Sequence, residues 1–362
     1  MSGNRRTINK AAIRRASQAA RKRMGRLDRE MEKNLTRIYR AASADIEAAI
    51  RGYGDEEENL RLEVLRDLLA QVNRRLTDLA GERDGLLTKN LREAAQLGVS
   101  PLVEMEAAAM PKVAEEAVRF VRHFTAADGL RLSDRLWRVD RQAREVVTRA
   151  VESSVIQGHS AAQAATAFLE RGERVPKLVR DQLAKSTGGK IARSAGEVLT
   201  GKVGSPWFNT LRVMRTEINR AHGEAYMAGA EADPEVAGFR FLLSPRHPRA
   251  DICDLHASAN LYGLGPGVYP SREKCPWPAH PFTLSFVEVV FKDEVSESDK
   301  KGKEDPVGWL KKQKPEVQVG VLGSVKKRAA LEKGILVKGE IATPWQVLEK
   351  RYNKRGIDTK DW

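Results

Sequence analysis

Both cysteines of the sequence lie in one short window, and a histidine closely follows each of them. Cys253 and His256 form a C-x2-H pair, Cys275 and His280 form a C-x4-H pair, and eighteen residues separate the two pairs. Such pairs of thiolate and imidazole ligands are typical of structural zinc sites, where four ligands occupy the corners of a tetrahedron. Because the sequence has only six histidines, this clustering predicts a Zn²⁺ site formed by Cys253, His256, Cys275 and His280.

Three alternatives remain open for this window. Two buried free cysteines would be ordinary small core residues that need no metal. A disulfide between Cys253 and Cys275 would need an oxidising compartment, and the N-terminus does not resemble a secretion signal. His247 and Asp251 lie nearby, and either could replace one of the four ligands, since zinc also accepts carboxylates.

The predicted site favours a structural role over a catalytic one. Four protein ligands close the coordination sphere, whereas a catalytic zinc keeps one position open for water. Asp251 or Asp254 could act as the general base of a zinc-dependent hydrolase or nuclease that acts on DNA. The sequence contains no HExxH helical ligand pair, however, and we therefore expect no enzymatic activity.

The formal net charge of +14 is concentrated at the N-terminus. Residues 1–27 contain nine basic residues and no acidic residue. Such a block repels itself, so we expect a disordered arm that binds DNA without sequence preference through phosphate contacts. An acidic protein surface is the alternative partner. The candidate nucleic-acid-binding residues are Arg5, Arg6, Lys10, Arg14, Arg15, Arg21, Lys22, Arg23 and Arg26.

Apolar residues at helical spacing predict a mainly α fold with a long helical N-terminal half. Helices are expected at 27–50, 55–98, 111–124 and 132–156. The second of them carries a leucine stripe that suits a coiled coil or a long bundle helix. Gly158 should end the fourth helix, Ser160 should cap the next one, and 186–190 should be a loop. No apolar run approaches the length of about 20 residues that a membrane-spanning helix needs.

A small α+β zinc-binding unit is expected near residues 205–291. An apolar helical face at residues 211–225 precedes two expected strands, at 237–243 and 283–291. The glycine- and proline-rich stretch 257–274 between them should be neither helix nor strand. A sheet this small is not stable alone, so the metal and the helix would have to stabilise it.

A series of short motifs runs through this region in a fixed order. The motifs are Arg215-Thr216-Glu217 and then Ala221, Gly-Phe-Arg-Phe at 238–241, Asp251 with Cys253 and His256, and Pro278-Ala279-His280-Pro281. Their order resembles the core of the phage Mu F-like head morphogenesis family, the minor head proteins of tailed phages. The resemblance covers roughly residues 150–291. Many members have H-P-x-C-x-C where this chain has His280-Pro281-Phe282-Thr283-Leu284.

The C-terminal part is similar to the segment that often follows this core in phage members. It carries Trp309-Leu310, then Gln318, then Val321-Leu322-Gly323 and a short helix that ends at Gly334. With this resemblance, the chain divides into four segments. They are a basic disordered arm at 1–27, a long-helix region and possible coiled coil at 28–158, a Mu F-like core with its metal-binding loop at 159–291, and a lysine-rich helical tail at 292–362.

The resemblance implies a minor capsid protein of a tailed phage or prophage. Such a protein is made in the host cytoplasm and lies inside the procapsid, in few copies, at the portal vertex. Its partners would be the portal protein, a scaffold or major capsid protein, and phage DNA bound non-specifically, with no membrane contact. A host nucleoid or transcription factor with a basic arm is a further alternative, although no recognition-helix motif supports it.

Overall fold

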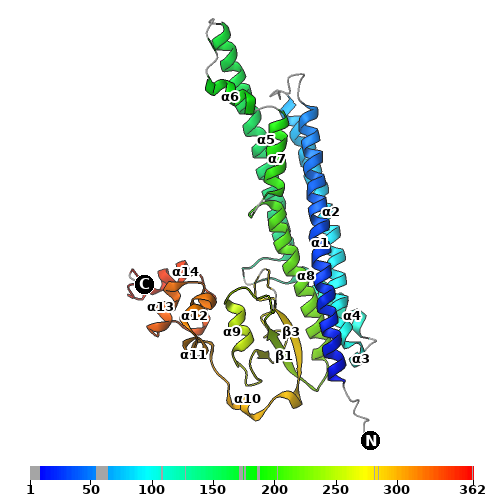
Figure 1. Cartoon of the computed structure of the whole chain (residues 1–362), viewed down its shortest axis with the longest axis vertical. Coiled ribbons are helices and arrows are strands. Elements are labelled where there is room, and N and C mark those ends of the chain that lie inside the picture. Colours follow the sequence, from blue (N-terminus) through cyan, green and yellow to red (C-terminus); the bar gives the residue numbers. More distant parts are fainter. Residues whose placement is uncertain are drawn as a thin grey trace. The chain divides into compact units, whose positions relative to one another are not determined.

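The chain is mainly helical and contains one small three-stranded antiparallel sheet (Figure 1), which confirms the predicted fold class at this level. No helix of the described residues is both long and apolar enough to cross a membrane. The computed structural model describes residues 9–53, 64–106, 109–126, 128–170, 174, 177–185, 188–201, 203–280, 282–283, 285–360 and 362.

Two compact units make up the chain, and each is assembled from segments that are distant in the sequence. Unit 1 contains Met1–Arg23, Ala94–Val118 and Asn219–Trp362, whereas unit 2 contains Met24–Glu93 and Arg119–Ile218. These boundaries differ from the four consecutive segments expected from the sequence. The reason is that long helices contribute residues to both units, so that a boundary falls inside a helix and not in a linker.

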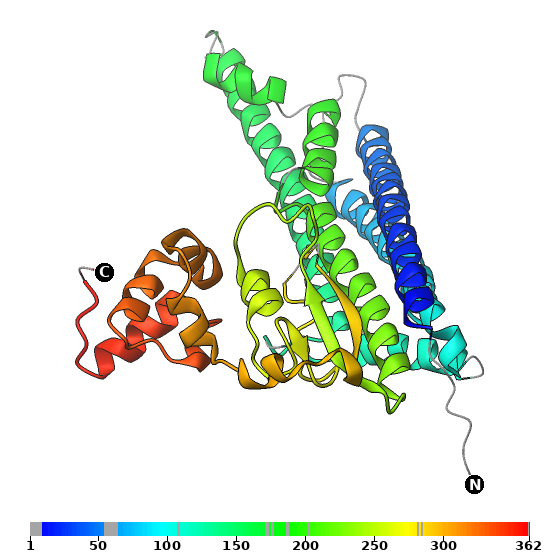
Figure 2. The ribbon, with the colours of Figure 1, turned by 60° about the horizontal axis from the view of Figure 1, so that its bottom comes forward.

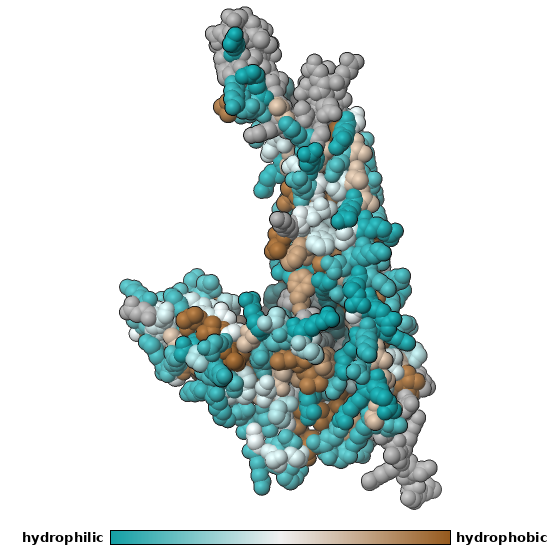
Figure 3. Space-filling view, in the orientation of Figure 1, coloured by the Kyte–Doolittle hydropathy of each residue, from teal (hydrophilic) through white to brown (hydrophobic). Residues whose placement is uncertain are grey.

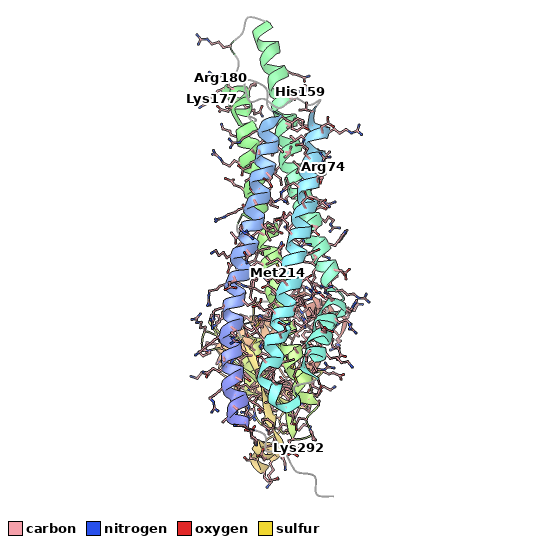
Figure 4. The ribbon with its side chains drawn as sticks, turned by 90° about the vertical axis from the view of Figure 1, so that its right-hand side faces the viewer. Arg74, His159, Lys177, Arg180, Met214 and Lys292 are labelled. Atoms are coloured by element: carbon pink, nitrogen blue, oxygen red, sulfur yellow. The ribbon has the colours of Figure 1, made fainter. Side chains whose placement is uncertain are left out.

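The helices that contribute to both units are long and amphipathic. They are α1 (Lys10–Gly52), α2 (Leu65–Val99), α4 (Met110–His123) and α8 (Pro206–Glu231). α1 ends at Gly52 as predicted, and the apolar face expected on α8 is buried, including Met214 (Figure 4). The predicted start of α2 at residue 55 lies outside the described residues, and its leucine stripe is buried.

Unit 2 consists of helices packed side by side (Figure 1). α5 (Leu132–Glu170) packs against α6 (Lys177–Lys185) and α7 (Gly188–Thr200). Ion pairs join the other helices: Asp45 of α1 pairs with Arg75 of α2 at 2.6 Å, and Asp28 of α1 pairs with Arg215 of α8 at 2.7 Å. Arg215, the first residue of the Arg-Thr-Glu motif, therefore serves to attach α8 to α1.

Polar contacts are also buried inside unit 2. Arg83 of α2 is its largest fully buried side chain, 1% exposed, and its guanidinium pairs with Asp140 of α5 and with Asp84. The hydroxyls of Tyr39 and Thr210 lie 2.6 Å apart, and burial raises the pKa of Tyr39 to about 12. These contacts connect α1 with α8 and α2 with α5 through the buried side chains of Tyr39, Thr210 and Arg83, whereas the acidic partners of Arg83 are partly exposed.

Two of the predicted helix ends are wrong. α5 does not end at Gly158 but continues to Glu170, so Ser160 is not a helix N-cap. The alanine-rich stretch 161–167 favours helix strongly enough to offset the cost of about 1 kcal/mol for one internal glycine. α7 begins at Gly188, so the loop expected at 186–190 is helical from that residue on, and residues 186–187 lie outside the described residues.

The prediction of a disordered arm is wrong for residues 10–27, which form the first part of α1. Residues 1–8 lie outside the described part of the chain. Ile13, Ala20 and Leu27 are buried, so the segment gains apolar contacts that offset the repulsion among its charges. Acids of unit 1 neutralise part of the block through three ion pairs, Lys10–Asp293, Arg14–Glu294 and Arg21–Glu288.

The sheet of unit 1 lies against the C-terminal half of α8 (Figure 2). It contains β1 (Val236–Leu242), β2 (Val268–Tyr269) and β3 (Phe286–Phe291), in the order β2-β1-β3. The strands predicted at 237–243 and 283–291 are β1 and β3, whereas β2 lies in the stretch expected to have no strand. Phe239 of the central strand pairs with both Tyr269 and Val289. The hydroxyl of Tyr226 on α8 accepts a hydrogen bond of 3.2 Å from the Val289 amide and so joins the helix to the sheet.

The remaining elements of unit 1 are short helices. η2 (Ser100–Leu102) and α3 (Val103–Glu106) follow α2, and α9 (Ile252–Ser258) follows β1. The C-terminal helices pack around a separate apolar cluster that includes Trp309, Leu348 and Tyr352. They are α11 (Pro306–Lys311), α12 (Pro315–Leu322), α13 (Val325–Glu332) and α14 (Trp345–Lys354). η3 (Lys292–Glu294) and α10 (Glu297–Lys301) precede them, and η4 (Lys338–Glu340) lies between α13 and α14.

His222 of α8 should make unit 1 sensitive to acid. Its Nε2 is buried and has no hydrogen-bond partner among the described residues. Burial, with a smaller contribution from Arg21, lowers the pKa of His222 from 6.5 to about 4. The unfolded chain therefore binds the extra proton between pH 6.5 and 4, so stability falls as the pH falls through this window. At pH 5 the loss should be about 2 kcal/mol relative to pH 7.5.

The measurement is chemical unfolding of wild type and His222→Phe at both pH values. Other carboxyls and histidines titrate in both proteins, so the difference between the two pH dependences isolates His222. We expect the variant to lose about 2 kcal/mol less than wild type on acidification. Identical pH dependences would contradict the assignment.

Candidate metal centre

The N-terminus of α9 holds the central carboxylate of the candidate site. Asp251 is the N-cap residue, and its Oδ1 accepts a hydrogen bond of 2.7 Å from the Cys253 amide. Asp254 completes the capping box, because its Oδ2 accepts from the Asp251 amide at 2.8 Å. The cap fixes the Asp251 side chain and leaves its second oxygen, Oδ2, directed at other residues.

Asp251, Cys253 and His280 bring three different ligand atoms together. His280 Nε2 lies 3.2 Å from Cys253 Sγ and 3.2 Å from Asp251 Oδ2. One ligand atom from each of the three residues lies within 4.8 Å of the others. Cys253 is fully buried, whereas the side chains of Asp251 and His280 are about one-third exposed, at 31% and 34%. The group is therefore open to solvent on one side.

The donor set fits a zinc ion. Ligand atoms at tetrahedral corners around zinc lie about 3.3–3.7 Å apart, given bond lengths of about 2.0 Å to nitrogen or oxygen and 2.3 Å to sulfur. The two distances of 3.2 Å around His280 Nε2 are close to this spacing. Thiolate, imidazole and carboxylate are all zinc ligands, and the mixture of sulfur and nitrogen disfavours calcium or magnesium.

His256 lies one helical turn after Cys253 but makes a different contact. Its Nδ1 lies 2.9 Å from the hydroxyl of Tyr269, and its ring lies 5.7 Å from that of Phe241. Burial lowers the pKa of His256 to about 4, with smaller and opposing effects of Asp251 and His280. The imidazole is therefore neutral, with Nδ1 engaged by Tyr269 and only Nε2 left as a possible metal ligand.

Like His256, Cys275 is a predicted ligand that lies apart from the group of Asp251, Cys253 and His280. It lies in the apolar core of unit 1 with Phe241 and Tyr269, 6% exposed, and it joins no group of three candidate ligands among the described residues. Burial raises the pKa of the Cys275 thiol to about 12. Both cysteines are free, so the alternative of a disulfide between Cys253 and Cys275 is not formed.

A second group of candidate ligands shares Asp251. His247 Nε2 lies 2.9 Å from Asp254 Oδ2 and 3.8 Å from Asp251 Oδ1. The two oxygens of Asp251 thus face different histidines, Oδ1 toward His247 and Oδ2 toward His280. His247 and Asp251 are the two spare ligands identified in the sequence, and the structure brings Asp251 to the thiol of Cys253.

The Cys253 thiol is protonated in the absence of a cation. Burial raises its pKa to about 11, and hydrogen bonds from the nearby hydroxyls only partly offset this effect. Thr283 Oγ1, one of these hydroxyls, lies 3.7 Å from Sγ. Since the thiolate is the form that binds zinc, a metal ion would have to displace this proton on binding.

Trp277 anchors the loop that carries His280 to α8. Its indole Nε1 donates to the backbone carbonyl of Asn219 at 3.3 Å. The indole also covers Gly223, where a Cβ would overlap the ring.

A second close approach to α8 is made by Gly98 of α2, whose Cα faces the carbonyl of His222 so closely that a Cβ would not fit. Both glycines are therefore required by packing against α8.

The sequence contains a second pattern that indicates the position of Asp251, and the spacing of cysteines and histidines does not reveal it. Asp251 and Asp254 stand three residues apart at the start of a helical stretch, which is the pattern of a capping box. That pattern predicts that Cys253 and His256 lie on a helix and not on a turn. Asp251, as the N-cap of this helix, then lies beside Cys253 and belongs to the group of candidate ligands.

Comparisons with known proteins add no relative. No family model, no curated protein and no solved structure matches this chain. The likeness to the phage Mu F-like family therefore stands on the motifs at residues 215–217, 238–241, 251–256 and 278–281 alone.

Proposed function

We propose that this chain is a minor head protein of a tailed phage or prophage, with a structural zinc ion in unit 1. It would act inside the procapsid at the portal vertex, in contact with the portal protein, a scaffold or major capsid protein, and DNA. Support comes from the order of the Mu F-like motifs and from one structural observation. That observation is the meeting of Asp251, Cys253 and His280 from two separate motifs, with His280 Nε2 3.2 Å from a ligand atom of each of the other two residues.

The proposed metal would be held by Asp251, Cys253 and His280, whose ligand atoms lie within 4.8 Å of one another. Cys275 then serves as a core residue. A bound zinc would cross-link α9 to the loop after Trp277.

Metal analysis of mutant proteins tests the proposal directly. We expect purified wild type to contain about one zinc ion per chain. Cys253→Ala and His280→Ala should each abolish stoichiometric zinc, because each removes a ligand from the group. The measurements are mass spectrometry of the native protein and elemental analysis after gel filtration.

Cys275→Ala is the matched control, since it removes a second buried thiol from the same unit. It should retain zinc if Asp251 takes the place of the Cys275 thiol in the ligand set, whereas loss of zinc would restore Cys275 to that set. A wild-type protein without zinc, whose melting temperature a chelator leaves unchanged, would overturn the metal proposal. Failure to enter procapsids on co-expression with the portal and major capsid proteins of the same genome would overturn the head role.

One observation favours the alternative of a zinc-dependent hydrolase or nuclease. The group of mutually close ligands has three members and is open to solvent, and three protein ligands with an open position are typical of catalytic zinc. His247 and Asp254 lie next to it and could serve as the general base. Cleavage of DNA by wild type with zinc, abolished in Asp254→Ala, would favour this alternative.

A further inference from the structure

One face of α1 within unit 2 carries a line of basic side chains, here named the α1 basic stripe. Its members are spaced by three, four, four and three residues, which places them on one side of a helix. All of them are exposed. The stripe consists of Arg26, Arg29, Lys33, Arg37 and Arg40.

The stripe lies opposite the buried side of α1. Met31, Leu35 and Ala42 face the core of unit 2 and are at most 1% exposed. The helical angle of 100° per residue puts the stripe on the far side of the helix from these three residues. Figure 3 shows hydrophilic residues over the outer face of α1, and Figure 4 shows nitrogen-tipped side chains that extend from it into solvent.

The acids of α1 are directed away from the stripe. Asp28 and Glu32 both pair with Arg215 of α8, at 2.7 and 2.6 Å, and Asp45 pairs with Arg75 of α2. Only Glu30 is an exposed acid beside the stripe. The fold thus uses the negative charges of α1 for contacts between helices and leaves its positive charges unopposed on the surface.

The surface of the stripe suits a phosphate backbone better than a protein. None of its five members makes an ion pair with a described residue, and no large apolar side chain within Lys10–Gly52 is among the exposed ones. Protein interfaces take most of their affinity from aromatic and apolar anchors, which this face lacks. Four of the five members are arginines, whose planar guanidinium groups bind phosphate oxygens in pairs.

We propose that the α1 basic stripe binds the phosphate backbone of duplex DNA, without base specificity. From Arg26 to Arg40 the helix rises about 21 Å, so the stripe offers roughly one positive charge per 5 Å along a straight line. Duplex DNA carries one negative charge per about 1.7 Å of axis and can match every member. The inference rests on the DNA contact proposed above, but not on the metal or on the capsid role.

The stripe differs from the basic segment singled out in the sequence. Lys10, Arg14 and Arg21 of that segment already pair with acids of unit 1, which reduces the charge they can offer to DNA. The stripe begins at Arg26 and extends into a part of α1 that also contains acids, so a count of net charge along the sequence does not reveal it. Its charges become a continuous surface only when the helix forms.

A fourfold variant tests the stripe separately from residues 1–27. Arg29→Gln, Lys33→Gln, Arg37→Gln and Arg40→Gln are combined, and binding to a 30-base-pair duplex of arbitrary sequence is measured by fluorescence anisotropy between 50 and 200 mM salt. Glutamine has nearly the helix propensity of arginine and lysine, so α1 should form normally. Circular dichroism and the melting temperature check this point.

We expect the variant to bind at least tenfold more weakly at 50 mM salt. The slope of log affinity against log salt concentration should fall in magnitude by about 3 to 4, since each lost phosphate contact removes about 0.9. The matched control changes four exposed lysines of unit 1 to glutamine, which alters the net charge equally and should change affinity much less. These control positions are Lys311, Lys338, Lys350 and Lys354.

The outcomes separate the possible failures. Equal losses in the variant and the control would mean that net charge, and not the stripe, drives binding, which would overturn the inference. Unchanged binding by the stripe variant, with loss in a variant of the basic residues within 5–23, would overturn the stripe but keep the proposed DNA contact. A wild type that binds polyglutamate but not the duplex would overturn both.

Discussion

Replacing Gly223 with alanine should destabilise unit 1 by about 2–4 kcal/mol and should weaken zinc binding as well. The new Cβ would occupy the space of the Trp277 indole, which is a rigid side chain and not the end of a flexible one. To make room, the ring must leave α8 and give up its hydrogen bond to the Asn219 carbonyl. Because His280 follows Trp277 by three residues, the displacement should also move a proposed metal ligand.

Gly85→Ala is the matched control for this substitution. Gly85 lies inside α2, and a Cβ there would meet no atom within 4 Å. Alanine at this position should leave stability unchanged or raise it by up to about 1 kcal/mol, through its better helix propensity. Chemical unfolding measures both variants, and isothermal titration with zinc measures the effect on the site. Equal stability of Gly223→Ala and wild type would contradict the packing described for Trp277.

Arg83→Met should be the most destabilising substitution in unit 2, at about 3–5 kcal/mol. The guanidinium is 1% exposed, and it donates to Asp140 Oδ2 at 3.2 Å and to Asp84 Oδ1 at 2.7 Å. Methionine fills part of the volume but leaves the Asp140 carboxylate without its cation in a partly buried position. The cost therefore comes from an uncompensated charge more than from lost packing.

Arg75→Met provides the comparison, because Arg75 also joins two helices of unit 2 through two acids, Asp45 and Glu82. Its side chain is 17% exposed and its partners are exposed, so its loss should cost at most about 1 kcal/mol. The double variant Arg83→Met, Asp140→Leu should recover part of the stability lost by Arg83→Met alone, since it removes the unpaired charge. An Arg83→Met protein as stable as Arg75→Met would contradict the assignment.

Local patterns predicted many of the elements. The apolar spacing at 27–50 predicted a helix that is part of α1, and the β-branched and aromatic run at 283–291 predicted β3. Such signals depend on neighbours within a few residues, and the sequence contains them in full. β2 has only two residues, Val268 and Tyr269. It pairs with β1, although the whole of α9 lies between the two strands in the sequence. A strand so short has no periodicity of its own and could not be predicted locally.

The charge block at the N-terminus shows why its structure could not be predicted. Repulsion among nine basic residues argues for disorder when the segment is considered alone. In the fold, Glu288, Asp293 and Glu294 neutralise three of these residues, although they lie more than 260 positions away in the sequence. The contacts that make residues 10–27 helical are therefore tertiary.

The candidate site was predicted in part. Cys253 and His280 belong to the group of close ligands, and Asp251 was identified as a possible replacement for one of the four. Spacing could not show that Cys275 faces the apolar core with Phe241 and Tyr269, because that depends on the path of the loop around β2. The assignment of zinc itself stays a prediction.

The construction of unit 1 from three separated segments constrains how the chain can fold during synthesis. The first turns of α1 leave the ribosome early, yet their partners Tyr226 and Glu288 are made more than 200 residues later. Until those residues are synthesised, Ile13 and Ala20 cannot be buried, and the apolar face of this part of α1 stays exposed to solvent. Unit 2 is complete once Ile218 has been made, so it can fold before the last segment of unit 1 is synthesised.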